Sequence, residues 1–252
     1  MNKSLTLDEE KTLCELYATT RNAVLAKTYG ISGSTVLNIL KRHGVKLKPK
    51  HVGNKYDFNI HFFDKIDTES KAYFLGLLYA DGCHYKKTRQ ISIELSATDK
   101  DILEKMKVAF SSNHPLSSWY RITPVSKTNN QYFTLRMSNE HFSKKCEELG
   151  LVERKSLILK PPTEEQVPTN LIHHFIRGYF DGDGSITLIL DKTQRACGAS
   201  IIGTTEFCEW CKRIVESFVK EKTGAVYLNK TSLGLSYYRV AGVQRMLNFL
   251  NF

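Results

Sequence analysis

The sequence predicts an α+β fold of two similar halves, preceded by a small all-helical domain, and three observations support this prediction. First, an apolar segment ending in Asp-Gly occurs twice, at residues 73–82 and 175–184. Second, strand-like alternation and helix-like spacing follow each copy in the same order. Third, the apolar residues of segment 1–50 recur at helical spacing, without strand-like alternation. We therefore expect each half to run helix, two strands, helix, two strands, helix.

The N-terminal segment is expected to form a helix-turn-helix, because a tight turn separates the last two of three short helices. Gly30 suits the left-handed end of the second helix, and Ser32 can cap the third. On the third helix Val36, Leu37 and Leu40 are expected to face inward. The expected helices cover residues 7–17, 22–29 and 34–43.

The charge of the chain favours a polyanionic partner. The formal net charge is +10, and the stretch from Leu16 to Lys50 carries seven basic residues and no acidic one. Such an excess indicates nucleic acid before an anionic membrane. The alternatives here are a solvated basic face and a three-helix packing module with no DNA role. In this domain the residues expected to contact DNA are Ser34, Thr35, Asn38, Lys41, Arg42, Lys46 and Lys48.

Domain boundaries follow from the change of pattern. Residues 1–50 are the expected helix-turn-helix domain and residues 51–66 a linker. Residues 67–252 are expected to form one domain, with halves at about 67–162 and 163–252. No apolar run is long enough for a membrane span and no secretory signal is visible, so a cytoplasmic, nucleoid-associated protein is expected. Cys208 and Cys211 form a CxxC motif within an amphipathic helix, where core packing is favoured over a zinc or redox role.

The second domain should contain strands at residues 91–95, 132–136, 185–190, 199–203, 225–229 and 237–240. Helices are expected at residues 99–110, 139–149 and 205–222. The two repeated segments are expected to form helices that pack on each other. Each has small residues four positions apart, Gly76 and Ala80 in one and Gly178 and Gly182 in the other. Residues i and i+4 share a helix face, and small side chains allow two backbones to approach closely.

Each repeated helix ends in an aspartate, Asp81 or Asp183, where the helix dipole disfavours negative charge. Packing the helices side by side would bring the two carboxylates together, and they would repel unless a divalent cation lay between them. Hard oxygen ligands suit Mg²⁺. The repeat therefore predicts a magnesium site made by both halves.

These duplicated segments resemble the paired LAGLIDADG motifs of homing endonucleases, and the helix-turn-helix before them is similar to that of phage- and intron-borne members. The resemblance implies the pseudo-two-fold LAGLIDADG endonuclease fold, with antiparallel saddle sheets in the DNA major groove. It also implies that Asp81 and Asp183, with Gly82 and Gly184, hold Mg²⁺ for phosphodiester hydrolysis. Lys155 matches the lysine that acts near the hydrolytic water, with an ordinary surface lysine as the alternative.

The partner implied by this resemblance is a double-stranded DNA target bound by a monomer. Polar and basic residues of the expected strands would contact it, although any single one of them could be an ordinary solvated residue. In the first half these are His84, Lys86, Lys87, Arg89, Gln90, Arg121 and Lys127, and in the second half Lys192, Gln194, Arg195 and Lys230.

Two departures from the family pattern concern the second half. Counting from Asp183, the counterpart of Lys155 falls beyond Phe252, so this half is expected to lack that lysine. At a strand end where some members carry a polar catalytic residue, the halves offer Ser96 and Ile202. Two functions therefore stay open. The first is a site-specific, metal-dependent DNA endonuclease, and the second is a weakly active or inactive DNA- or RNA-binding protein, such as a maturase or regulator.

Overall fold

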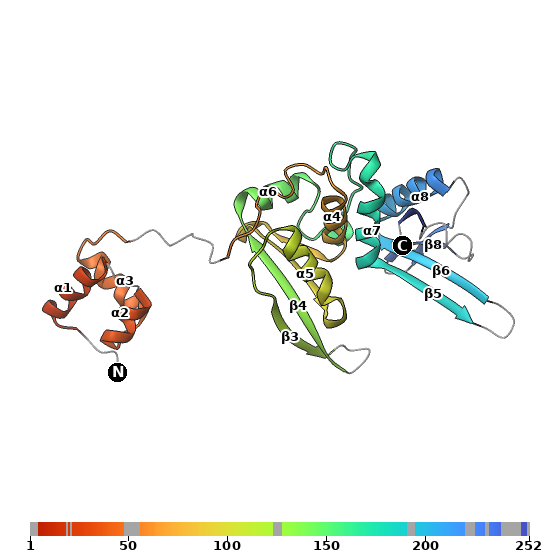
Figure 1. Ribbon diagram of the computed structural model, residues 1–252. Coiled ribbons are helices and arrows are strands. Elements are labelled where there is room, and N and C mark those ends of the chain that lie inside the picture. The colour runs from red at the N-terminus through yellow and green to blue at the C-terminus, as the bar shows by residue number, and fades with distance from the viewer. Residues whose placement is uncertain are drawn as a thin grey trace. The chain divides into compact units, whose positions relative to one another are not determined.

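The computed structural model describes residues 5–18, 20, 22–47, 56–122, 128–190, 195–219, 225–229, 232–237 and 248–250. The chain forms two compact units, residues 1–54 and 55–252, and each is described by itself (Figure 1). No helix within these described ranges is both long and apolar enough to span a membrane.

The first unit contains three helices, as predicted. Thr6 caps the first through a reciprocal pair of hydrogen bonds with Glu9, and the Ser32 hydroxyl accepts from the Thr35 N–H at the start of the third. Gly30 has φ +67°, the left-handed conformation expected of it. The helices are α1 (Leu7–Leu16), α2 (Asn22–Tyr29) and α3 (Gly33–Arg42).

A small apolar core holds these helices together, built from Leu13, Tyr17, Leu25, Val36, Ile39 and Leu40. The expected inward face of α3 was partly wrong, because Ile39 is buried whereas Leu37 only packs against the edge of the core. On the other side of α3, the side chains of Ser34, Asn38 and Lys41 are exposed.

The expected linker at residues 51–66 is too long. Phe58, Phe62, Phe63 and Ile66 are buried in the core of the second unit, and the Asn59 N–H donates to the Phe110 carbonyl at 2.7 Å. Burial removes the apolar surface of these side chains from water, while the described charged residues of the stretch stay solvated at the surface. The second unit therefore begins well before residue 67.

Two four-stranded antiparallel sheets of identical strand order make up most of the second unit. The first runs β1-β2-β4-β3 and the second β5-β6-β8-β7, which establishes the predicted internal symmetry. The first sheet contains β1 (Gly82–Tyr85), β2 (Gln90–Ser96), β3 (Ser117–Ile122) and β4 (Asn129–Ser138). The second contains β5 (Gly184–Leu190), β6 (Arg195–Gly203), β7 (Ala225–Asn229) and β8 (Ser232–Tyr237). The strand expected at residues 237–240 therefore lies earlier in the chain, and residues 238–240 are outside the described residues.

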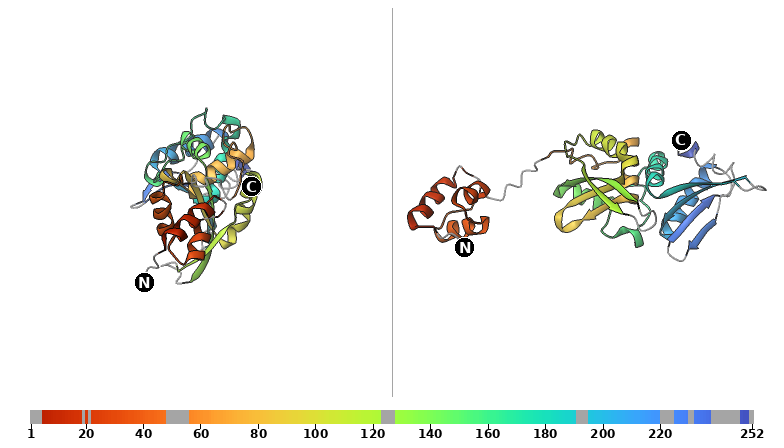
Figure 2. Two further views of the ribbon diagram at one scale, coloured as in Figure 1. Left: turned by 90° about the vertical axis from the view of Figure 1, so that its left-hand side faces the viewer. Right: turned by 90° about the horizontal axis from the view of Figure 1, so that it is seen from below.

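Two central helices lie side by side between the sheets, α4 (Glu69–Asp81) and α7 (Ile172–Asp183) (Figures 1 and 2). Helices α5 (Lys100–Ala109) and α6 (Glu140–Glu148) pack on the first sheet, and α8 (Thr205–Val219) packs on the second. Both cysteines of the CxxC motif are fully buried in α8, as expected for core packing. One continuous core thus joins the sheets through the helix pair.

Candidate functional site

Helices α4 and α7 approach each other closely at two glycines. A Cβ placed on Gly76 would lie 1.9 Å from the Phe175 carbonyl oxygen, and one on Gly178 would lie 1.9 Å from the Tyr73 carbonyl oxygen. Backbone therefore meets backbone at both positions, in a symmetric arrangement that no larger residue fits. This contact is the predicted one, and it determines where the two helices end relative to each other.

Asp81 and Asp183 are the last residues of the two helices. A Cβ on Gly182 would lie 2.7 Å from Oδ2 of Asp81, so this carboxylate lies against the α7 backbone one residue before Asp183. Desolvation, reinforced by the negative charge of Asp183 and opposed by Lys155, raises the pKa of Asp81 to about 6. Desolvation also raises the pKa of Asp183, against the effects of Lys155 and a hydrogen bond with Tyr179. Two half-buried carboxylates that oppose each other's ionisation are suited to share a divalent cation.

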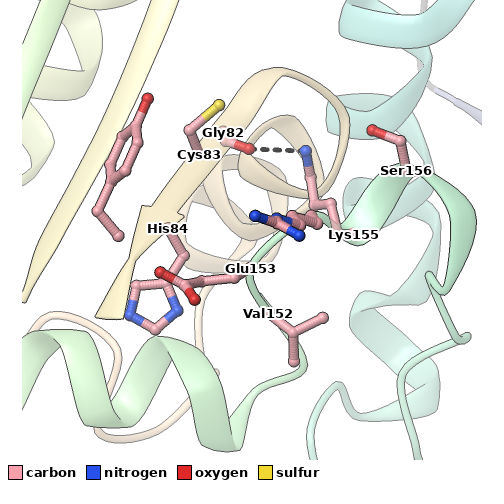
Figure 3. Close-up of a pocket in the computed structure, with 9 residues that line it drawn as sticks. Gly82, Cys83, His84, Val152, Glu153, Lys155 and Ser156 are labelled. Carbon is pink, nitrogen blue, oxygen red and sulfur yellow. Dashed lines mark hydrogen bonds between the residues drawn. The ribbon is translucent and has the colours of Figure 1, made fainter. Parts of the chain in front are cut away.

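Lys155 reaches this centre from a short 3-10 turn, Lys155–Leu157, that follows α6. Its Nζ donates to the Ala80 carbonyl oxygen at 2.7 Å, and the side chain is buried. It also donates to the Gly82 carbonyl oxygen at 2.6 Å (Figure 3). Desolvation lowers the pKa of Lys155, and the charges of Cys83 and of both aspartates oppose that shift. Within the described residues no other lysine is buried, so the ordinary surface lysine is excluded.

The loop that carries Lys155 is also tied to the first sheet. Glu153 accepts the Lys86 backbone N–H at 2.7 Å, at the turn between β1 and β2. The same loop and β1 line a pocket of about 370 Å³ that opens beside Gly82, Cys83 and Lys155 (Figure 3). The pocket gives solvent access to the lysine side of the centre.

Gly82 and Gly184, the expected metal-site glycines, occupy the positions where the chain leaves α4 and α7. A Cβ on Gly82 would lie 2.4 Å from the Leu78 carbonyl oxygen, and one on Gly184 would lie 2.3 Å from that of Phe180. Both glycines thus allow a strand to start directly at the helix end. The carbonyl of Gly82 accepts from Lys155, and so does that of Ala80, a backbone group that the sequence pattern did not single out.

The strand register corrects the comparison of Ser96 with Ile202. Gly82 pairs with Ile93 in the first half and Gly184 pairs with Ile201 in the second. Ile202 therefore corresponds to Glu94, and Thr204 corresponds to Ser96. The Ser96 hydroxyl donates to Asp99 at 2.6 Å, and the charge of Asp99 contributes to the raised pKa of Asp81, which places this strand end near the centre.

The face of the first sheet that points away from the helices carries aromatic and cationic side chains. The Trp119 indole donates to Glu94 at 2.8 Å. The Arg121 guanidinium stacks 4.4 Å from the Tyr132 ring centroid and 5.2 Å from that of Trp119. Arg136 is exposed on the same face, because its partner Ser92 alternates with the core residues of β2. The sequence pattern missed Trp119, Tyr132 and Arg136. For Tyr132 and Arg136 the available signal was their alternation with Phe133, Leu135 and Met137 along β4.

Several expected DNA contacts have protein partners here. Arg42 forms an ion pair with Glu10 of α1, Lys86 pairs with Glu147 at 2.6 Å, and Arg89 pairs with Glu140 at 2.9 Å. His84 was assigned wrongly, since it is buried and bonds to Ser143 at 2.7 Å. Lys46, Lys87 and Gln90 reach the surface at least in part. Arg195 lies in β6, and its side chain is outside the described part of the structure. Lys48, Lys127, Lys192, Gln194 and Lys230 fall outside the described residues.

Comparison with known proteins identifies a family model that matches part of the second unit. Residues 68–150, from the start of α4 to the end of α6, match the family model of the LAGLIDADG-like domain. The match includes the segment that ends at Asp81. The segment that ends at Asp183 lies outside the matched residues and is its counterpart in the second half, where the strand order is the same. No curated protein matches the sequence.

Three solved structures are similar to this chain. The homing endonuclease I-WcaI bound to its DNA recognition sequence has 15% sequence identity and a TM-score of 0.57, over 84% of this chain and 92% of that one. The N-terminal LAGLIDADG domain of DUF199/WhiA has 15% identity and a TM-score of 0.47, over 77% and 87%. The meganuclease I-AabMI bound to uncleaved DNA has 14% identity and a TM-score of 0.45, over 73% and 83%. The I-WcaI match establishes that the second unit has the LAGLIDADG endonuclease fold.

The pKa of the first LAGLIDADG aspartate leads to a testable pH dependence. The pKa of Asp81 is about 6 in the folded protein and 3.8 ordinarily, so between about pH 4 and 6 the folded state holds a proton that the unfolded chain has lost. Metal-free protein should therefore lose stability as pH rises through this window. Asp81→Asn should be more stable than wild type by about 1–2 kcal/mol at neutral pH, after allowance for solvent screening, and should have no advantage near pH 4. Chemical unfolding in the presence of a chelator measures the pH dependence of wild type and the stability difference of the variant. Equal stabilities at neutral pH would contradict the burial of the Asp81 carboxylate.

Proposed function

We propose that this protein is a site-specific endonuclease that hydrolyses both strands of double-stranded DNA with a divalent metal ion, Mg²⁺. The observation that carries the proposal is the convergence of Asp81, Asp183 and Lys155 where the LAGLIDADG helices end. The donor set consists of hard oxygens, and the carboxylates disfavour each other's charge, so it fits a hard divalent cation. A structural neighbour bound to its DNA recognition sequence supports the choice of substrate.

Each residue of the centre has a separate task. Asp81 and Asp183 would hold Mg²⁺, each from its own half, and Gly82 and Gly184 let the chain leave the helix ends without a side chain in the way. Bound there, Mg²⁺ would lower the pKa of a coordinated water and stabilise charge on the phosphate. Lys155 supplies a fixed positive charge beside the carboxylates, held by two carbonyls so that it need not reorganise during the reaction.

Target recognition would be divided between the two units. Strand faces of the second unit offer Arg121, Arg136 and Gln90 to base edges and phosphates. The outer side of α3 in the first unit offers Ser34, Asn38 and Lys41 in the manner of a recognition helix. Arg42 would contribute to α1–α3 packing through Glu10 rather than only to DNA.

A supercoiled plasmid carrying the native insertion site tests the proposal. With Mg²⁺, the protein should convert it first to nicked and then to linear form, and a chelator should stop both steps. The nicked form should accumulate, because the two halves are unequal: Lys155 donates to the Ala80 and Gly82 carbonyls of the first half, and no other lysine among the described residues is buried. Specific binding with no product at any Mg²⁺ concentration would contradict the proposal and leave a DNA-binding protein on the same scaffold.

The role of the first unit is tested by deleting residues 1–54, which leaves residues 55–252 whole. Binding should weaken, and the slope of log affinity against log salt should flatten by about 0.9 for every phosphate that the shortened protein no longer neutralises. A fluorescence titration of labelled target at several salt concentrations measures both quantities. The Lys41→Ala variant of the full chain is the point control and should flatten the slope by about 1. Unchanged affinity and slope after the deletion would show that this unit does not bind DNA.

A further inference from the structure

Two histidines and an aspartate converge on the surface of the second unit, away from the LAGLIDADG motifs. His61 and Asp64 lie in the turn that precedes α4, and His141 lies in the first turn of α6. Nδ1 of His61 is 2.8 Å from Oδ2 of Asp64, and Nε2 of His141 is 2.5 Å from Oδ1 of the same carboxylate. The two imidazole centroids are 4.7 Å apart. One nitrogen of each ring therefore points at the same small volume.

We propose that His61, Asp64 and His141 form a zinc-binding site, with water completing the coordination. One ligand atom from each residue lies within 4.8 Å of the others. A tetrahedral zinc ion with bonds of about 2.0–2.2 Å needs its ligand atoms about 3.4 Å apart, so small side-chain rotations bring the three atoms onto one ion. All three side chains are at least partly exposed, which leaves the fourth position open to solvent.

The backbone around these ligands is already fixed by the core beneath them. Phe63 stacks on Phe142, with centroids 5.6 Å apart, and these residues neighbour Asp64 and His141 in the chain. The Asp64 N–H donates to the His61 carbonyl at 3.1 Å, which closes the turn. The ligands are therefore positioned without a metal, and binding needs little further ordering of the chain.

The donor set separates this site from the motif centre. Two imidazole nitrogens and one carboxylate favour zinc and related transition metals, whereas the all-oxygen centre at Asp81 and Asp183 favours magnesium. A zinc ion here would join the turn before α4 to α6 at the point where the chain enters the second unit. The ion would cross-link these two segments, because each of them supplies a ligand, and the LAGLIDADG centre uses none of these residues. The competing possibility is a plain hydrogen-bonded His–Asp–His array.

Zinc binding to the metal-stripped full-length protein distinguishes these possibilities. Competition with a chromogenic chelator should give one tightly bound equivalent, and Co²⁺ should produce the visible absorption of a low-symmetry nitrogen and oxygen site. His61→Ala and His141→Ala should each weaken zinc binding by about a hundredfold or more. The double variant Asp81→Asn/Asp183→Asn should keep the site, which separates it from the nuclease centre. Asp67→Asn, an exposed carboxylate paired with Lys71, is the matched control and should bind like wild type.

Circular dichroism of each variant without metal verifies that it is folded, and the nearly isosteric Asp64→Asn should repeat the loss if an alanine variant unfolds. Zinc should also raise the unfolding temperature of wild type and not that of His141→Ala. No tight equivalent in wild type, or unchanged affinity in both histidine variants, would overturn the proposal and leave the hydrogen-bonded array.

Discussion

Asp81→Asn and Asp183→Asn should each abolish DNA cleavage, with the rate falling by about three orders of magnitude, while the affinity for the target stays within a few-fold of wild type. The reason is that each variant removes one of the two carboxylates where the motif helices end. An amide keeps the shape of the side chain but binds a hard cation far less strongly than a carboxylate. The loss of negative charge beside a phosphate also removes a repulsion, so binding should not weaken. Plasmid conversion and target titration measure the two properties separately.

Asp181→Asn is the matched control for this result. Asp181 belongs to the same helix, but its carboxylate accepts from the Tyr73 hydroxyl at 2.7 Å instead of facing Asp81. This variant should cleave within a few-fold of wild type. Loss of cleavage in all three aspartate variants would mean that overall helix charge, and not the paired site, is responsible.

Lys155→Met should slow cleavage without unfolding the protein, because Lys155 contributes charge rather than apolar packing.

Gly76→Ala and Gly178→Ala should destabilise the second unit by about 3 kcal/mol each, which is a large effect for the addition of one methyl group. The added carbon would lie 1.9 Å from a backbone carbonyl oxygen of the facing helix, and backbone cannot rotate away as a side chain can. The helices would have to separate, and the ends that carry Asp81 and Asp183 would separate with them. Denaturant midpoints measure the loss, and cleavage should fall more than stability alone explains.

Gly33→Ala tests whether the effect is steric. Gly33 is also helical, but a Cβ there would meet the Asn22 side chain only at 3.8 Å, an ordinary contact. Alanine is the better helix former, so this variant should be neutral or slightly stabilising, by up to about 1 kcal/mol. If Gly76→Ala proved as mild as Gly33→Ala, the close contact between the LAGLIDADG helices would be refuted.

The sequence could predict those parts of the fold that depend on the spacing of residues close together in the chain. The four-residue spacing of Gly76 and Gly178 with a second small residue indicated a close helix pair, and that contact is present. The position of Lys155 at the centre followed from the family resemblance. Its carbonyl partners could not be predicted, because every residue has a backbone carbonyl and the sequence does not show which one a lysine will reach. Ile202 was matched to the wrong residue because counting from strand ends ignores register, which only the pairing of strands determines.

Contacts between distant segments stayed hidden for a related reason. His61 and His141 are eighty residues apart in the sequence, and no periodicity connects a turn to the first turn of a distant helix. Phe58 and Phe63 were placed in a linker because neighbouring lysines and histidines dominated the pattern, yet the aromatic rings pack in the core. Both errors concern tertiary burial, which local composition does not specify.

The bond from the Lys86 backbone to Glu153 has a consequence for how targets are discriminated. Glu153 lies two residues before Lys155, and Lys86 belongs to the turn between two strands of the first sheet. If the protein cleaves DNA as proposed, a target that fits this turn poorly would shift the loop from which Lys155 extends, even where most phosphate contacts survive. Such a target would be bound almost as tightly as the correct one and cut more slowly, so that binding and cleavage would each select the sequence.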